Sequence, residues 1–235
     1  MRHYGTLLAG CLDNTMSREE PWYFGRLGQL VERADKTSRS LDVKYFHLLP
    51  SVQDVGSTLD ENQWAALLRS ASSFQMYRQK YGRIAPEKVV EFLILDRNFP
   101  RAILHCITRA EEYLHAISGT PMGSFSNAAE QHIGQLRAEL AYAGTPEILR
   151  IGLHEFLDQF QTKLNRVGAG IHAVLVGQHE GHGLALTPSC SRARWARPHG
   201  TINNSSRARA SAAAGAAVVT SALSRSSALS FLAGS

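Results

Sequence analysis

A zinc site is the first chemistry that this sequence suggests, because His179-Glu180-Gly181-His182 places two histidines around a carboxylate. In zinc-binding helices of the zincin type the two histidines stand at positions i and i+4, so that both ring nitrogens reach one ion. Here the histidines are three residues apart, and flanking glycines weaken any helix. We therefore expect no metal at this motif.

The remaining histidines and carboxylates follow no known catalytic spacing. His105 and His115 are ten residues apart, and His154 and His172 are eighteen apart, so each pair can share a helix face. Isolated histidines on helices are mostly ordinary surface or core residues. The sequence also lacks a strand followed by GxGxxG, a GxxxxGK[ST] loop, a GxSxG turn and a pair of ExxH motifs. We expect neither a cofactor nor a metal.

One long helix carries the most informative polar residues, Glu32 and Arg33. Ser17 followed by Glu20 has the spacing of a capping box, and Pro21 is tolerated in a first helical turn. Beyond this start, apolar and small residues recur at helical spacing and predict one buried face. The residues of that face are Trp22, Leu27, Leu30, Val31, Ala34, Ser38 and Leu41.

Two interpretations of the Glu32–Arg33 pair remain open. In the first, both residues belong to a solvated face that is stabilised by the i,i+4 pairs Glu32–Lys36 and Asp35–Arg39. In the second, Arg33 is an internal anchor that seeks a carboxylate such as Asp96 on a neighbouring helix, while Glu32 points elsewhere. The second interpretation predicts that Arg33→Ala destabilises the fold far more than Arg39→Ala.

Three segments of the chain resemble the bacterial alpha-E family of helical proteins, which is named for a Glu-Arg motif. They are SREEPWYFGRLGQLVERADKTSRSLDV, WAALLRSASSFQMYRQKYG and VVEFLILDRNFPRAILHCI. The resemblance extends from Gly5 to Val176, and it includes a Tyr-Arg element and an Leu-Asp-x-Asn-x-Pro-Arg element. Family members usually carry an earlier Trp-Leu-Gly-Arg-type helix and a small residue in place of Pro21. We therefore expect this chain to correspond to the distal half of a family member.

The resemblance implies both site residues and partners. Alpha-E proteins are commonly encoded beside ATP-grasp amide ligases and transglutaminase-like peptidases, which implies a role in the synthesis or processing of a peptide or amide-linked product. No motif of the family is a known active site. The polar residues that the resemblance singles out are Arg26, Glu32, Arg33, Tyr77, Arg78, Asp96, Asn98 and Arg101.

The charge of the chain is unevenly distributed. The formal net charge is +5, but no Asp, Glu or Lys follows Glu180, whereas six of the 25 Lys and Arg residues do. Residues 1–180 therefore hold 19 basic and 20 acidic residues. A nearly neutral body gives no electrostatic reason to expect nucleic-acid binding.

Cysteine usage and hydropathy indicate the compartment. Cys11, Cys106 and Cys190 are far apart and show no CxxC spacing, which favours a reducing environment over a disulfide framework. The first residues show no basic region followed by a long apolar run, and no segment reaches the apolar length that a membrane span needs. We expect a cytoplasmic protein.

Helix start and stop signals predict an all-α fold, an antiparallel bundle of about six helices. No stretch alternates as a strand would. The expected helices cover about 18–48, 60–82, 86–95, 98–118, 127–142 and 145–171.

The last part of the chain differs in kind from the rest. We expect a partial alpha-E-like domain over residues 1–177 and a disordered Ala/Ser/Arg-rich tail over residues 178–235, because such a composition buries too little apolar surface to order itself.

Two functions remain open. The first is an accessory or interaction protein that acts with the partners the family implies. The second is an enzyme with a helical pocket lined by Glu32, Arg33, Asp96 and Arg101, which would require these side chains to converge. We favour the first and lean away from an enzyme.

Overall fold

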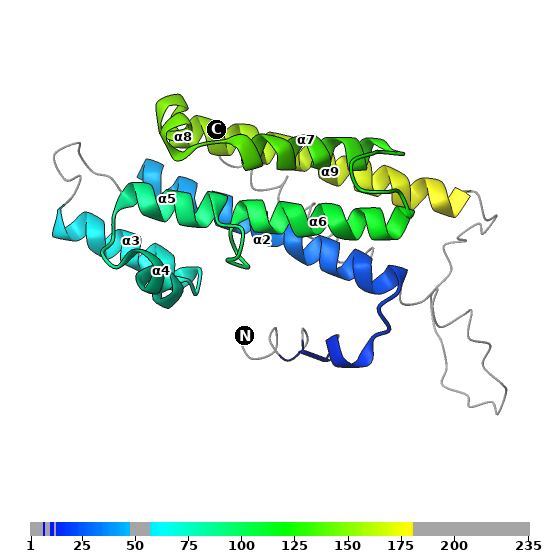
Figure 1. Cartoon of the computed structure of the whole chain (residues 1–235), viewed down its shortest axis with the longest axis horizontal. Helices are drawn as coiled ribbons and strands as arrows, with labels where there is room; N and C mark the ends of the chain where they lie inside the picture. The colour runs from blue at the N-terminus through cyan, green and yellow to red at the C-terminus, as the bar shows by residue number, and fades with distance from the viewer. Residues whose placement is uncertain (1–6, 8–9, 12, 48–56, 181–235) are drawn as a thin grey trace, which may run out of the picture.

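The structure, a computed structural model, describes residues 7, 10–11, 13–47 and 57–180 (Figure 1). For residues 45–47 and 175–180 it describes the course of the helix but not the side chains. The His179-Glu180-Gly181-His182 motif, Cys190 and the predicted disorder of the tail therefore lie outside the described residues.

The described residues form an all-α fold without strands, as the sequence predicts. None of their helices is both long enough and apolar enough to cross a membrane. The helices are α2 (Glu20–His47), α3 (Thr58–Ser70), α4 (Phe74–Tyr81), α5 (Pro86–Leu95), α6 (Ile103–Ser118), α7 (Ala128–Tyr142), α8 (Thr145–Ile151) and α9 (Leu153–Glu180).

Four of these helices, α2, α6, α7 and α9, pack as an antiparallel bundle. Each contacts two others, in the order α2, α6, α7, α9 and back to α2. Neighbours run in opposite directions, which is the up-and-down arrangement of four-helix bundles (Figure 1). The short helices α3, α4 and α5 lie between α2 and α6 in the chain, and α8 lies between α7 and α9.

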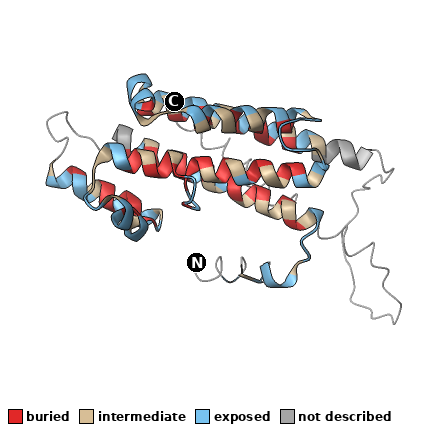
Figure 2. Cartoon of the chain, viewed as in Figure 1, coloured by how far each residue is buried: buried red, intermediate tan, exposed pale blue. Residues whose placement is uncertain are grey.

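The core runs along the facing sides of these helices (Figure 2). All seven residues of the stripe predicted on the first helix are buried, because α2 turns one face to α6 and α9. Burial of this apolar surface supplies most of the driving force for the fold. Ile151 is an exception among the predicted core residues, since 40% of its surface is exposed at the end of α8.

Several helix boundaries match their sequence signals. Pro86 is at the first position of α5, and Gly119 ends α6 in the left-handed conformation with φ 72°. The Asn127 side chain accepts a hydrogen bond from the backbone N–H of Glu130 at the start of α7.

Other boundaries differ from the prediction. The backbone N–H groups of Trp22 and Tyr23 donate to the Glu19 carbonyl at the start of α2, so Ser17 does not occupy the capping position. The segment predicted as one helix over 60–82 is two helices, because Ser72 adopts φ 53° between α3 and α4. Gly152, at φ 105°, likewise separates α8 from α9.

The start of α6 also lies later than expected. The helix begins at Ile103 rather than near Asn98, and residues 96–102 form a turn between α5 and α6. This turn packs against α2 and creates the site described next.

Candidate anion-binding site

Two segments that carry the family resemblance, more than sixty residues apart in the chain, meet in the structure. Arg33 on α2 donates from Nη1 to the carbonyl oxygen of Pro100 at 3.2 Å. One turn further along α2, the Thr37 hydroxyl lies 3.0 Å from the carbonyl oxygens of both Arg33 and Arg101. These contacts attach the 96–102 turn to the Glu-Arg helix.

Asp96 gives this turn its shape. Its Oδ1 accepts hydrogen bonds from the backbone N–H groups of Asn98 and Phe99, both at 2.8 Å, and its Oδ2 accepts one from Lys80 at 2.6 Å. Burial acts to raise the pKa of the Asp96 carboxyl, but these donors outweigh it and the pKa is lowered. Asp96 is therefore a charged structural anchor, and its partner is Lys80 rather than Arg33.

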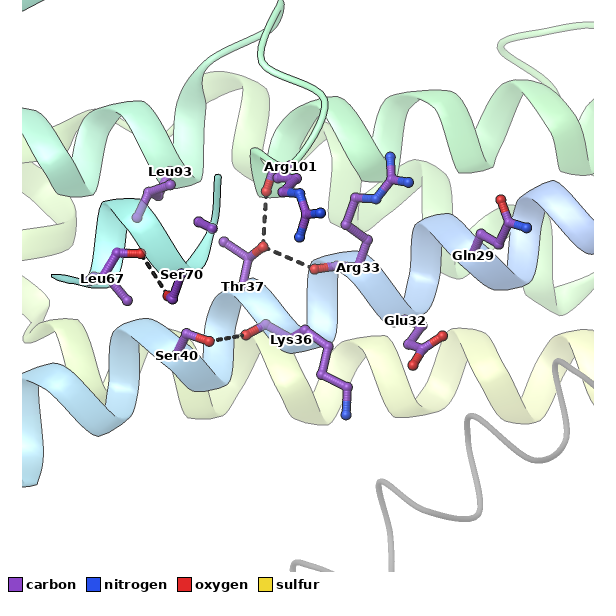
Figure 3. Close-up of a pocket in the computed structure, with 11 residues that line it drawn as sticks. Gln29, Glu32, Arg33, Lys36, Thr37, Ser40, Leu67, Ser70, Leu93 and Arg101 are labelled. Atoms are coloured by element: carbon purple, nitrogen blue, oxygen red, sulfur yellow. Dashed lines mark hydrogen bonds between the residues drawn. The ribbon is translucent and has the colours of Figure 1, made fainter. Parts of the chain in front are cut away.

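A pocket of about 450 Å³ opens beside the contact between α2 and the turn (Figure 3). Its floor and sides come from α2, α3, α5 and the turn. In Figure 3 the Arg33 and Arg101 side chains lie along one edge of α2, and Glu32 and Lys36 extend from the other edge. The polar residues that line it include Gln29, Glu32, Arg33, Lys36, Thr37 and Arg101.

The pocket carries an excess of positive charge. Within the described residues, Arg33, Lys36 and Arg101 form no ion pair. Glu32 is the one carboxylate among the residues that line the pocket, and it makes no ion pair with Lys36. The pairing predicted for Asp35 and Arg39 is present, since Arg39 Nε lies 3.0 Å from both carboxylate oxygens. Two arginines and a lysine without a carboxylate partner among the described residues have the chemistry to bind an anion.

Cys106 lies beneath this charge but is not a reactive group. Its thiol is fully buried and points to the Pro100 carbonyl oxygen at 3.5 Å. Burial raises the pKa of Cys106 to about 12, although Arg33 and Arg101 both act to lower it. The pocket therefore offers cations for binding but no thiolate nucleophile.

The other residues singled out by the resemblance lie outside this pocket. Tyr77 is fully buried, and its hydroxyl accepts a hydrogen bond from the backbone N–H of Ala85 at 3.1 Å. Tyr77 therefore fixes the connection between α4 and α5. Arg78 is exposed on α4, with its guanidinium 5.9 Å from the Phe74 ring centre.

Asn98 and Arg26 are also set apart from it. Asn98 is exposed and lines a second pocket next to Asp96. Arg26 pairs with Asp13, donates to Gln29 at 3.0 Å and lies over the Trp22 ring. Of the eight residues, Arg33 and Arg101 thus lie near each other and Glu32 lines the same pocket from the opposite edge of α2, whereas Asp96 holds the turn.

A sequence model of the Alpha-E family, described as a predicted alpha-helical domain with a conserved ER motif, matches residues 1–174 of this chain. The match covers well over half of the sequence. The chain belongs to the Alpha-E family. Its sequence contains a single Glu-Arg dipeptide, Glu32–Arg33, and both residues line the pocket. No curated protein and no solved structure matches the chain.

Sequence reasoning missed Lys36 and Thr37 as members of the site. Thr37 is buried although it lies beside the predicted stripe, and Lys36 was expected to pair with Glu32. The available signal was position, because residues one turn beyond Arg33 on the same helix share its surroundings.

Proposed function

We propose that this Alpha-E protein is an accessory or interaction protein that holds an anionic group of a peptide or protein partner in the pocket at Glu32 and Arg33. The observation that carries the proposal is that Arg33 and Arg101 lie on one edge of the pocket and Lys36 lines it from the other edge, while none of the three has a carboxylate partner among the described residues. Guanidinium groups bind carboxylates and phosphates in bidentate fashion, so this pocket would favour a carboxylate or a phosphate of the partner.

The chemistry of the partner follows from the resemblance. We propose that the protein acts with an ATP-grasp amide ligase and a transglutaminase-like peptidase in the synthesis or processing of a peptide or amide-linked product. Peptides present both carboxylates and amide N–H groups. Arg33 and Arg101 suit the carboxylates, and the exposed carboxylate of Glu32 suits an N–H or an amine.

An enzyme with a helical polar pocket is the second candidate. The observation that favours it is that Glu32, Arg33 and Arg101 line one pocket. Two features favour binding instead. Asp96, the fourth residue such an enzyme was expected to use, is committed to Lys80 and two backbone N–H groups. The Cys106 thiol beside the arginines is buried with its pKa raised to about 12.

We further propose that residues 1–177 are the functional unit, that residues 178–235 are a separate tail, and that the protein works in the bacterial cytoplasm. The free cysteines at positions 11 and 106 are compatible with a reducing compartment.

Co-purification of the full-length chain with a co-expressed ATP-grasp ligase or transglutaminase-like protein tests this function. We expect recovery of a partner by the natural protein and loss of the partner with Arg33→Gln combined with Arg101→Gln. Arg78→Gln combined with Arg83→Gln removes two exposed arginines near α4 and serves as the matched control. Equal recovery by both double variants, or recovery of neither partner, would refute the proposal.

A further inference from the structure

The pocket at Glu32 and Arg33 adjoins two further pockets. It shares Gln29 and Arg33 with a pocket of about 200 Å³ between α2 and α6. That pocket in turn shares His105 and Arg109 with one of about 440 Å³ between α6 and α7. We call these three adjoining pockets the groove.

Positive charge follows the groove along its whole length. Seven Lys and Arg residues line it, against two carboxylates, Glu32 and Glu112. Three of the cations already have carboxylate partners: Arg26 with Asp13, Arg109 with Glu112, and Arg137 with Glu111. The other four, which form no ion pair within the described residues, are Arg33, Lys36, Arg97 and Arg101.

The net charge of residues 1–180 does not reveal this clustering of basic residues. Residues 1–180 are nearly neutral overall, yet the groove collects more than a third of their basic residues and only two of their acidic ones. A concave surface lined by one sign of charge attracts a ligand of the opposite sign. Arg97 in the pocket at α7 and Arg101 in the pocket at α3 form no ion pair within the described residues, so a ligand with several separated negative charges would contact more of these cations than a single anion would.

From this arrangement we infer that the groove binds an extended acidic peptide segment, which identifies the ligand class of the function proposed above and rests on that proposal. The part of the groove along α2, from Arg26 to Lys36, spans about 15 Å at 1.5 Å per residue. An extended peptide rises about 3.3 Å per residue, so this part alone accommodates about five residues. Its alternate side chains would face the cations, and its backbone N–H groups would have Glu32 as an acceptor.

Two other occupants fit the groove less well. Residues 181–235 of this chain contain Arg but no Asp or Glu, so the cations repel the chain's own C-terminal segment. A single-stranded nucleic acid would need aromatic faces on which its bases could stack. Of the two tyrosines that line the groove, Tyr113 is packed against the Trp22 and Tyr23 rings at 5.5 Å and 5.7 Å, which leaves Tyr142 alone.

Fluorescence anisotropy with the full-length chain tests the inference, using labelled, N-acetylated glutamate peptides of two, four and six residues at low salt. We expect at least a tenfold gain in affinity from two to six residues. Arg33→Gln should weaken the binding of every peptide. Arg97→Gln should weaken the six-residue peptide about three- to tenfold and leave the two-residue peptide unchanged, since Arg97 lines the pocket between α6 and α7 and not the pocket at Glu32 and Arg33.

Two controls separate groove binding from general attraction. Arg78→Gln removes an exposed arginine outside the groove, and Arg207→Gln with Arg209→Gln removes charge from the C-terminal segment. Neither should change the affinity by more than about twofold. Circular dichroism of each variant verifies that the helices are retained.

Each contrary outcome has a distinct meaning. If Arg33→Gln weakens binding but peptide length and Arg97→Gln have no effect, the groove is overturned and the single-pocket function stands. If Arg33→Gln also has no effect on peptide binding, both the groove and the proposed single-pocket function are refuted. Loss of binding in the C-terminal variant, or tighter binding of an oligothymidylate of equal charge than of the six-residue peptide, overturns the acidic peptide as the ligand.

Discussion

At the scale of single residues, the site depends on which polar groups are occupied and which are free. The Asp96 carboxylate accepts hydrogen bonds from Lys80 and two backbone N–H groups, and Arg33 donates one N–H to the Pro100 carbonyl. The Arg101 and Lys36 side chains form no hydrogen bond or ion pair among the described residues. Asp96 is thus held in structural contacts, whereas the Arg101 and Lys36 side chains are available for the binding proposed above.

Arg33→Ala should therefore cost only modest stability. The change removes one hydrogen bond from a half-buried side chain to a carbonyl, a loss of about 0.5–1.5 kcal/mol, and not the larger loss expected from a buried ion pair. Chemical denaturation of Arg33→Ala beside Arg39→Ala measures this directly. A loss above about 3 kcal/mol for Arg33→Ala would restore the internal-anchor interpretation.

Asp96→Ala should destabilise the fold by about 1–3 kcal/mol, because it leaves two backbone donors in the turn without their acceptor. Its partner supplies the control. Lys80 is half exposed, so Lys80→Gln should cost about 0–1 kcal/mol in the same denaturation experiment. Equal losses from the two changes would mean that the ion pair, and not the backbone contacts, gives Asp96 its role.

His154 on α9 adds a pH-dependent link to α2, since its Nδ1 lies 2.6 Å from Asp42 Oδ1. The hydrogen bond with Asp42 raises the pKa of His154 above its ordinary 6.5. A raised pKa in the folded state means that protonation stabilises the fold. This stabilisation is complete below about pH 6.5 and is lost as the pH rises through the folded-state pKa.

His154→Gln should consequently lower the melting temperature more at pH 6 than at pH 8.5. The side chain is 40% exposed, so the difference should stay within about 1 kcal/mol. His172→Gln, an exposed position on the same helix, is the control and should show no such pH dependence. A pH-independent effect of His154→Gln would show that Asp42 does not hold the charged form.

At the scale of helices, close packing between α7 and α9 sets the width of the bundle. A Cβ at Gly170 would lie 3.0–3.1 Å from the Cα, Cβ and backbone nitrogen of Ala129. Backbone atoms cannot move aside as a flexible side chain can, so the helices would have to separate.

Gly170→Ala should therefore lower stability, by about 1–3 kcal/mol for overpacking, despite the better helix propensity of alanine. Gly25→Ala is the matched control, because nothing lies within 4 Å of its Cβ position on α2. That change should raise stability by about 0.5–1 kcal/mol. Melting curves that show stabilisation by both substitutions would contradict the close approach.

The helices also mark the limit of sequence-based prediction here. The buried stripe of α2, Pro86 at the start of α5 and Gly119 at the end of α6 follow from local chemistry, and all were predicted. The break at Ser72 was not, because the apolar pattern continues from α3 into α4 and serine rarely adopts φ 53°. The contact of Arg33 with Pro100 was also missed, since the acceptor is a backbone carbonyl that leaves no trace in residue type or spacing.

At the scale of the whole molecule, the bundle brings charges together that the sequence keeps apart. Arg33, Arg97, Arg101 and Arg137 come from α2, the 96–102 turn and α7, and they line adjoining pockets although the body is nearly neutral. The central claim of the account is that the two arginines at the Glu-Arg pocket bind the carboxylates of a peptide.

Nuclear magnetic resonance of the arginine Nε–Hε groups tests that claim most directly. Spectra of the full-length chain, assigned through Arg33→Lys and Arg101→Lys, would be followed during titration with N-acetylated triglutamate. The account predicts saturable shifts of the Arg33 and Arg101 signals while the Arg78 signal stays in place. Unchanged Arg33 and Arg101 signals at saturating peptide, or shifts confined to arginines after Glu180, would contradict it.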